Sequence, residues 1–135
     1  ERSASSILSV QNNKSKEDDS ATIERLHKIK NIGLHTRNIF ENGNLDEFGE
    51  ILHEHWLTKK GLSNGISDSY IDEAYETALK NGAIGGKVVG AGGGGFLLVY
   101  CPTNKSKLIS AMSRLNLFPM WFSFEHEGAK IVFYG

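Results

Sequence analysis

The chain has few of the residues that would place it in several common classes of protein. Its 135 residues include one cysteine and two prolines, and 15 basic side chains nearly balance 16 acidic ones. The lone Cys101 excludes an internal disulfide framework and a cysteine-rich zinc site. A net charge of −1 provides no positive field for a nucleic acid. We therefore expect neither a disulfide-stabilised domain nor a nucleic-acid partner.

Long apolar runs are also missing. No run approaches the roughly 20 residues that a membrane-spanning helix needs, and residues 1–4 do not have the apolar centre of a signal peptide. We expect no membrane association and a cytoplasmic location, with Cys101 as a small core residue after the apolar run 96–100. The chain opens without methionine on the charged Glu1, so we expect a fragment of a longer protein.

Glycine, by contrast, is in excess. The chain has 15 glycines, against an average usage of about 7% in proteins. Glycine is used where the backbone must bend or approach another group closely. More than half of these glycines lie in one short stretch: Gly82, Gly85, Gly86, Gly90, Gly92, Gly93, Gly94 and Gly95.

The first part of the chain has a helical pattern. Residues 4–11 predict a short helix, and the strongly polar residues 12–20 predict a solvated loop. Apolar residues then recur every three or four positions over residues 21–42, which predicts a long helix with one buried stripe that ends at Gly43.

Two further helices are expected before the glycine-rich stretch. Asn44 and Glu47 have the spacing that satisfies free amide groups at a helix start, and the helix should continue to about Lys60. Residues 68–81 have one apolar face and predict another helix, with Gly82 as its terminator.

After Gly82 the apolar pattern becomes typical of strands. Two short runs rich in strand-forming residues flank the glycines, and a helical segment and two alternating segments joined by a turn signal follow. The predicted elements are strands at 83–89 and 96–101, a helix at 105–116, and strands at 120–124 and 129–134 around a turn at 125–128. The sequence thus predicts an α+β domain, with helices followed by a β-β-α-β-β antiparallel sheet layer.

The segment Gly90–Gly95 matches the literal pattern G-x-G-x-x-G, but its context is wrong for a dinucleotide site. That site needs a helix directly after the glycines and an acidic residue about 20 positions later; here a strand follows, and position 115 is leucine. A P-loop is excluded too, because Val88 follows Gly86-Lys87 where Ser or Thr is required. Bare glycine backbone could instead form an anion-binding nest; a flexible linker or a close packing contact remains the alternative.

The residues around these glycines resemble a known family. The segment Gly85–Phe96, preceded by Gly82-Ala83, resembles the third motif of the GHMP small-molecule kinases. The segments Arg2–Leu8, Gly65–Asp68 and the glycines with Phe96–Leu98 resemble the D-glycero-D-manno-heptose 7-phosphate kinase branch of that family. The resemblance covers essentially the entire chain.

The resemblance implies that residues 1–135 form the C-terminal domain of such a kinase, with a ferredoxin-like sheet. The enzyme would transfer the γ-phosphoryl group of ATP to the anomeric hydroxyl of the heptose phosphate, a step toward lipopolysaccharide or capsule sugars. ATP and Mg would be bound mainly by the N-terminal half of the same protein, which would also carry the catalytic residues. The fragment alone is then expected to be inactive.

The resemblance also implies where phosphates and substrate meet, in a loop formed by Gly90, Ala91, Gly92, Gly93, Gly94 and Gly95. On the substrate side it draws attention to Arg2, Ser67 and Asp68. Arg2 is suited to a sugar phosphate, with a surface salt bridge as its alternative role. Ser67 and Asp68 open a predicted helix, so they are alternatively its caps.

Other positions limit these expectations. Val89 stands where mevalonate kinases often carry Thr or Ser, so a hydroxyl contact is missing or supplied elsewhere. His53 and His55 are two apart on a predicted helix, where side chains diverge, so we expect no metal site. A second class of function stays open, a non-catalytic anion-binding or dimerisation module, and a homodimer is compatible with either class.

Overall fold

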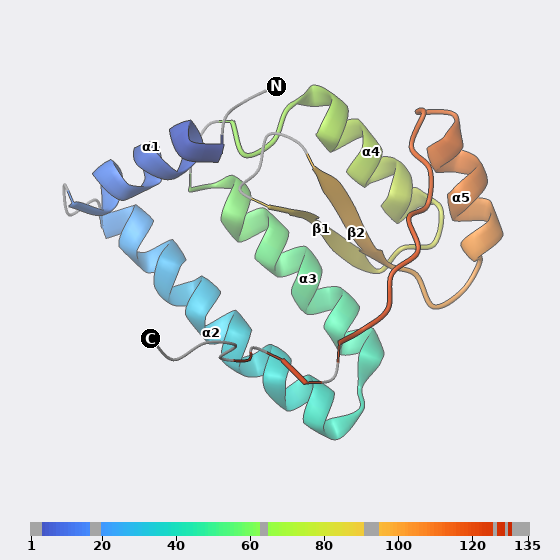
Figure 1. The fold of residues 1–135 in the computed structure, drawn as a ribbon, viewed down its shortest axis with the longest axis horizontal. Coiled ribbons are helices and arrows are strands. Elements are labelled where there is room, and N and C mark those ends of the chain that lie inside the picture. Colours follow the sequence, from blue (N-terminus) through green and yellow to red (C-terminus); the bar gives the residue numbers. More distant parts are fainter. Residues whose placement is uncertain are drawn as a thin grey trace.

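The computed structural model describes residues 4–16, 20–62, 65–90, 95–125, 127, 128 and 130. Helices dominate the first part of the described chain, and a two-stranded sheet and a last helix follow (Figure 1). The elements are α1 (Ala4–Lys16), α2 (Ser20–Asn42), α3 (Leu45–Lys60), α4 (Ser69–Lys80), β1 (Gly85–Val89), β2 (Phe96–Tyr100) and α5 (Lys105–Ser113). The predicted α+β class is confirmed.

The long helices α2 and α3 lie side by side and antiparallel (Figure 1). Gly43 joins them with a φ of +73°, a conformation that favours glycine. The Asn44 side chain accepts the backbone N–H of Glu47 at 3.5 Å and donates to its carboxylate at 2.8 Å. The predicted start of α3 is therefore confirmed, with both residues in the predicted roles.

The core has two clusters of buried side chains, one between α2 and α3 and one where α3, α4 and β1 meet. The first contains Ile32, Ile39 and Ile51, and the second contains Trp56, Leu62, Ile66, Tyr75 and Val88. Burial of apolar side chains of this size contributes roughly 1.5–3 kcal/mol each. The second cluster fixes the position of β1 relative to both helices that flank the sheet in Figure 1.

Glycine lets α3 approach β1 closely. A Cβ atom at Gly85 would overlap the carbonyl oxygen of Gly49 in α3 and would lie 2.9 Å from the backbone nitrogen of His53. A Cβ atom at Gly49 would lie 2.9 Å from the Ile84 side chain and 2.7 Å from that of Tyr100. Part of the glycine excess therefore serves helix-to-strand packing.

Strands β1 and β2 pair antiparallel, with Gly85 opposite Tyr100 and Val89 opposite Phe96. The connection between them is the glycine-rich segment. Cys101 follows β2 and is buried, and its thiol donates to the carbonyl oxygen of Thr103. The prediction that Cys101 is a core residue is confirmed.

Two predictions of secondary structure are wrong. α1 continues to Lys16, so residues 12–16 are helical rather than a loop. They contain no glycine or proline to stop a helix, and their polar side chains tolerate solvent. Residues 120–124 form no strand: Trp121 is 88% exposed and Phe124 74% exposed, so an alternating pattern is not sufficient for a strand.

The end of the chain is described only in part. At the predicted turn 125–128, the Glu125 carboxylate accepts hydrogen bonds from the backbone N–H groups of Glu127 at 2.8 Å and Gly128 at 2.6 Å. The predicted strand 129–134 lies outside the described residues, apart from Lys130, which is not part of a strand.

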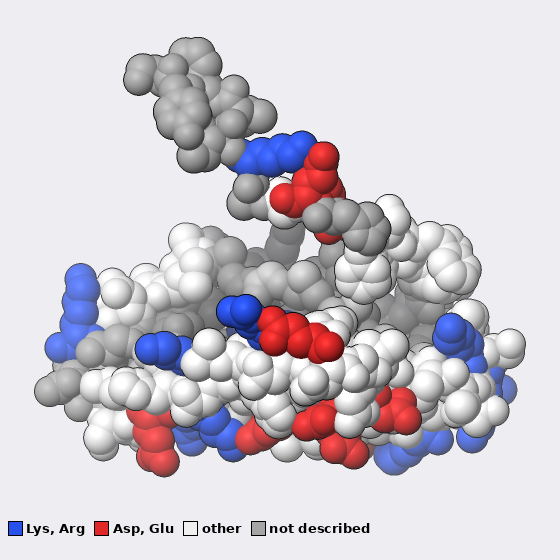
Figure 2. Space-filling view, turned by 90° about the horizontal axis from the view of Figure 1, so that it is seen from below, with Lys and Arg blue, Asp and Glu red and all other residues white. Residues whose placement is uncertain are grey.

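None of the described helices is long and apolar enough to cross a membrane. Figure 2 shows basic and acidic side chains interspersed on one face of the molecule.

Candidate functional site

Gly90 and Gly95 are the described ends of the glycine-rich segment. Gly90 directly follows Val89 and Gly95 directly precedes Phe96, the last residue pair of the sheet. Both adopt a left-handed backbone, with φ of +116° and +110°. Among the described residues, nothing lies within 4 Å of a Cβ atom placed at Gly90, whereas one at Gly95 would lie 2.8 Å from the Val89 carbonyl oxygen. The segment therefore begins with exposed backbone, and glycine is required at both ends. Residues 91–94 lie outside the described residues, so their predicted role stays a prediction.

Asp68 and Ser67 lie at the start of α4. The Asp68 carboxylate accepts the backbone N–H of Ile71 at 2.9 Å, as an N-cap does. The Ser67 hydroxyl donates to the Asp72 carboxylate at 2.7 Å, and the Lys60 ammonium donates to the same oxygen at 2.5 Å. Asp68 therefore has the capping role given as its alternative, whereas Ser67 contacts a side chain of α4 and does not cap the helix. Arg2 lies outside the described residues.

The Asp72 carboxylate links α3 and α4 through these two donors. Burial alone would raise the pKa of Asp72, but the hydrogen bonds from Lys60 and Ser67 and the Lys60 charge together lower it below its usual value. The pair ties the last turn of α3 to the first turn of α4.

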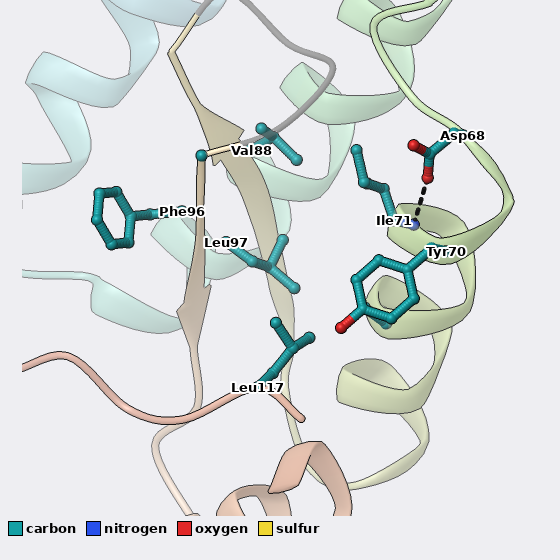
Figure 3. Close-up of a pocket in the computed structure, with 9 residues that line it drawn as sticks. Asp68, Tyr70, Ile71, Val88, Phe96, Leu97 and Leu117 are labelled. Atoms are coloured by element: carbon teal, nitrogen blue, oxygen red, sulfur yellow. Dashed lines mark hydrogen bonds between the residues drawn. The ribbon is translucent and has the colours of Figure 1, made fainter. Parts of the chain in front are cut away.

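A pocket of about 300 Å³ lies between the start of α4 and the sheet, and both Asp68 and Gly95 line it. In Figure 3, Val88 and Leu97 of the strands face Ile71 of α4 across this pocket. The Tyr70 hydroxyl donates to the Leu115 carbonyl oxygen at 2.6 Å, and Leu117 also lines the pocket. The structure thus brings one predicted substrate residue, Asp68, to the same pocket as the end of the glycine segment.

A basic cluster lies at the other end of the glycine segment. The Lys59 ammonium donates to the carbonyl oxygen of Gly90 at 2.7 Å, and Lys87 Nζ lies 3.2 Å from His55 Nδ1. Burial lowers the pKa of Lys59, and burial and then the Lys59 charge lower that of Lys87. The pKa of His55 is lowered to about 4, mostly by burial and to a smaller extent by the charges of Lys87 and Lys59. The sequence did not predict this cluster; the one available signal was the spacing of four between His55 and Lys59 on α3.

His53 has a structural role. Its Nδ1 atom lies 2.6 Å from the Tyr75 hydroxyl, and the two rings stack with centroids 5.8 Å apart. Burial raises the pKa of Tyr75, and a backbone hydrogen bond from Gly86 partly opposes that shift. Within the described part of the chain, no three His, Cys, Asp or Glu side chains are grouped so that they could hold a metal ion.

Comparison with known families and structures identifies the family of this domain. The family model described as GHMP kinases C terminal matches residues 36–116. The chain belongs to the GHMP kinase C-terminal family. It is 33% identical over 87% of its length to D-glycero-alpha-D-manno-heptose 7-phosphate kinase of Campylobacter jejuni. It is also 33% identical, over half of its length, to mevalonate kinase of Thermococcus onnurineus.

Solved GHMP kinase structures share this fold. Mevalonate kinase of L. major, solved with R-mevalonate, superposes on 84% of the chain with a TM-score of 0.77 at 14% identity. Mevalonate kinase of Staphylococcus aureus covers 69% of it with a TM-score of 0.60 at 23% identity. The chain spans 35% of the heptose kinase and 20% of the Thermococcus mevalonate kinase. The family is that of kinases, and the GHMP kinase domain described above is one part of such proteins.

Proposed function

We propose that this GHMP kinase domain is the C-terminal part of an ATP-dependent sugar-phosphate kinase. Its acceptor is the anomeric hydroxyl of D-glycero-D-manno-heptose 7-phosphate, and transfer takes place in the cytoplasm, where ATP is available. The observation that carries this proposal is the 33% identity to a heptose 7-phosphate kinase over 87% of the chain. Because the chain spans 35% of that relative, the proposed activity belongs to a longer protein and not to this domain alone.

The glycine segment would contribute close backbone approach and fixed dipoles to the transfer of the phosphoryl group. Phosphoryl transfer depends almost entirely on positioning and on stabilising the charge of the transition state. Open backbone at Gly90 and the left-handed conformations of Gly90 and Gly95 support this role. On the substrate side, Asp68 lines the adjoining pocket, and we include Arg2 and Ser67 as further contacts.

ATP and Mg would supply the phosphoryl group and the charge neutralisation that such a reaction needs. The described residues fit a phosphate through Lys59, Lys87 and the glycine backbone. The described residues contain no group of three or more His, Cys, Asp or Glu side chains that could hold a metal ion by itself. We therefore assign the Mg ligands to the N-terminal part of the protein.

A kinetic assay on the full-length protein tests this function. ADP release, followed with a coupled assay, should require D-glycero-D-manno-heptose 7-phosphate, and the 135-residue chain alone should release none. ADP release at the same rate without the sugar, or with galactose in its place, would contradict the proposed substrate.

A substitution tests the role of the glycine segment. Gly92→Val should abolish phosphoryl transfer and leave the thermal unfolding temperature close to that of the wild type, because it puts a branched side chain where phosphates must approach backbone. Gly33→Ala is the control, since a Cβ atom there meets no described residue within 4 Å. If Gly92→Val keeps wild-type activity, the segment does not lie near the transferred phosphate.

A further inference from the structure

Two lysines converge at the point where β1 ends and the glycine segment begins. His55 and Lys59 lie one turn apart on α3, so they share a face of that helix. Lys87 lies on the same face of β1 as Gly85, the residue whose backbone contacts α3. The glycine contact between helix and strand therefore brings Lys87 to the His55 side chain, with 3.2 Å between Lys87 Nζ and His55 Nδ1.

This lysine pair, Lys59 and Lys87, has no acidic partner among the described residues. The ion pairs found there use other cations, namely Lys28, His35, Arg37, Lys60, Lys80 and Lys130. Lys59 instead donates to the Gly90 carbonyl oxygen at 2.7 Å, and each member of the pair is partly buried. The C-terminus of α3 favours a positive charge at Lys59. It does not account for the second positive charge, that of Lys87 on β1.

The contact with Lys87 determines the protonation state of the His55 imidazole. An ammonium group only donates hydrogen bonds, so the contact between Lys87 and His55 requires Nδ1 to be unprotonated. The proton of the neutral ring then lies on Nε2, where it is a further donor. The lowered pKa of His55, caused by burial and by both lysines, agrees with a neutral ring at pH 7. The cluster therefore offers donors and positive charge, with no carboxylate among its described members.

We propose that Lys59 and Lys87 bind a phosphate group beside Gly90. The two partly buried ammonium groups repel each other, as the effect of the Lys59 charge on the pKa of Lys87 shows. A phosphate bound by both would replace this repulsion with charge-assisted hydrogen bonds. The choice of phosphate as the anion rests on the proposed kinase function. The phosphate could belong to the nucleotide or to the sugar phosphate, which share the same oxygen chemistry.

Calorimetric titration of the full-length protein tests the proposal and separates these sources. Wild type and the Lys59→Met and Lys87→Met variants are titrated with pyrophosphate, ATP and heptose 7-phosphate, with Lys80→Met as a control on α4. Each variant of the pair should lose about tenfold or more in affinity, whereas Lys80→Met should not. A loss for ATP and pyrophosphate assigns the site to the nucleotide, and a loss for heptose 7-phosphate alone assigns it to the sugar. Unchanged affinity for all three ligands would overturn the proposal.

Unfolding measurements separate binding from a structural role. Removing one of two repelling charges should leave the unfolding temperature unchanged or raised, and Lys87→Arg, which keeps the charge, should retain affinity within a few-fold. If the Met variants are destabilised but, below their unfolding temperatures, bind pyrophosphate, ATP and heptose 7-phosphate as the wild type does, the pair serves the fold and not a bound phosphate. The ADP assay on the wild type tests the proposed function independently of this site. If pyrophosphate binds through Lys59 and Lys87 but ADP release does not depend on the heptose, the proposed function is contradicted while the phosphate site is supported.

Discussion

The close contact between α3 and β1 predicts that Gly85→Ala is strongly destabilising. The added methyl group would overlap the Gly49 carbonyl oxygen and lie 2.9 Å from the His53 backbone nitrogen. Neither neighbour is the end of a flexible side chain, so no rotamer change relieves the overlap and α3 must move away from β1. Overpacking of this kind typically costs about 1–3 kcal/mol, occasionally more. We expect a value at or above the upper end, because the closest obstacle is backbone.

Chemical denaturation, supported by thermal melts, measures this effect. For a domain of this size about 1 kcal/mol corresponds to roughly 4 °C, so Gly85→Ala should lower the unfolding temperature by about 12 °C or more. Gly33→Ala controls for the general effect of replacing glycine by alanine. In the open helical position of Gly33 it should stabilise the protein by about 0.5–1 kcal/mol. Equal stability of Gly85→Ala and the wild type would refute the packing described for α3 and β1.

Two further predictions concern His55 and Asp68. The pKa of His55 falls from 6.5 to about 4 on folding, so the unfolded chain binds more protons between these values and stability should increase from pH 4 to 6.5, by on the order of 1–2 kcal/mol after allowance for solvent screening. His55→Gln should remove this increase in urea midpoints, while His27→Gln should retain it. Asp68→Ala should cost about 1 kcal/mol through loss of the α4 cap, whereas Asp68→Asn should not. If Asp68 contacts the sugar as proposed, Asp68→Asn should raise KM for the heptose, and an unchanged KM would exclude that contact.

The helices were predictable where local chemistry decides them. Asn44 and Asp68 occupy helix starts that a single hydrogen bond defines, and the apolar period of residues 21–42 is long enough to specify α2. The prediction of a strand at 120–124 was wrong because an alternating pattern reports only a preference, and the large apolar side chains of this segment are exposed instead of packed against a core. Residues 12–16 are helical although their polarity favours a loop, because polarity alone does not end a helix.

The candidate site was predictable only in part, for a related reason. Glycine composition identified the segment 90–95, and the family resemblance gave it a role. The lysine pair depends on how α3 packs against β1, and no local pattern joins Lys59 to Lys87 across 28 positions of sequence. The two glycines that set that packing, Gly49 and Gly85, were visible in the sequence, but the closeness of their contact was not.

The most direct test of the proposed function is the identity of the product. The full-length protein is incubated with ATP and D-glycero-D-manno-heptose 7-phosphate, and the mixture is followed by phosphorus NMR. The account predicts a new phosphate resonance coupled to the anomeric proton of the heptose, together with ADP in equal amount. Consumption of ATP without that resonance, or no consumption by a folded protein, would contradict it.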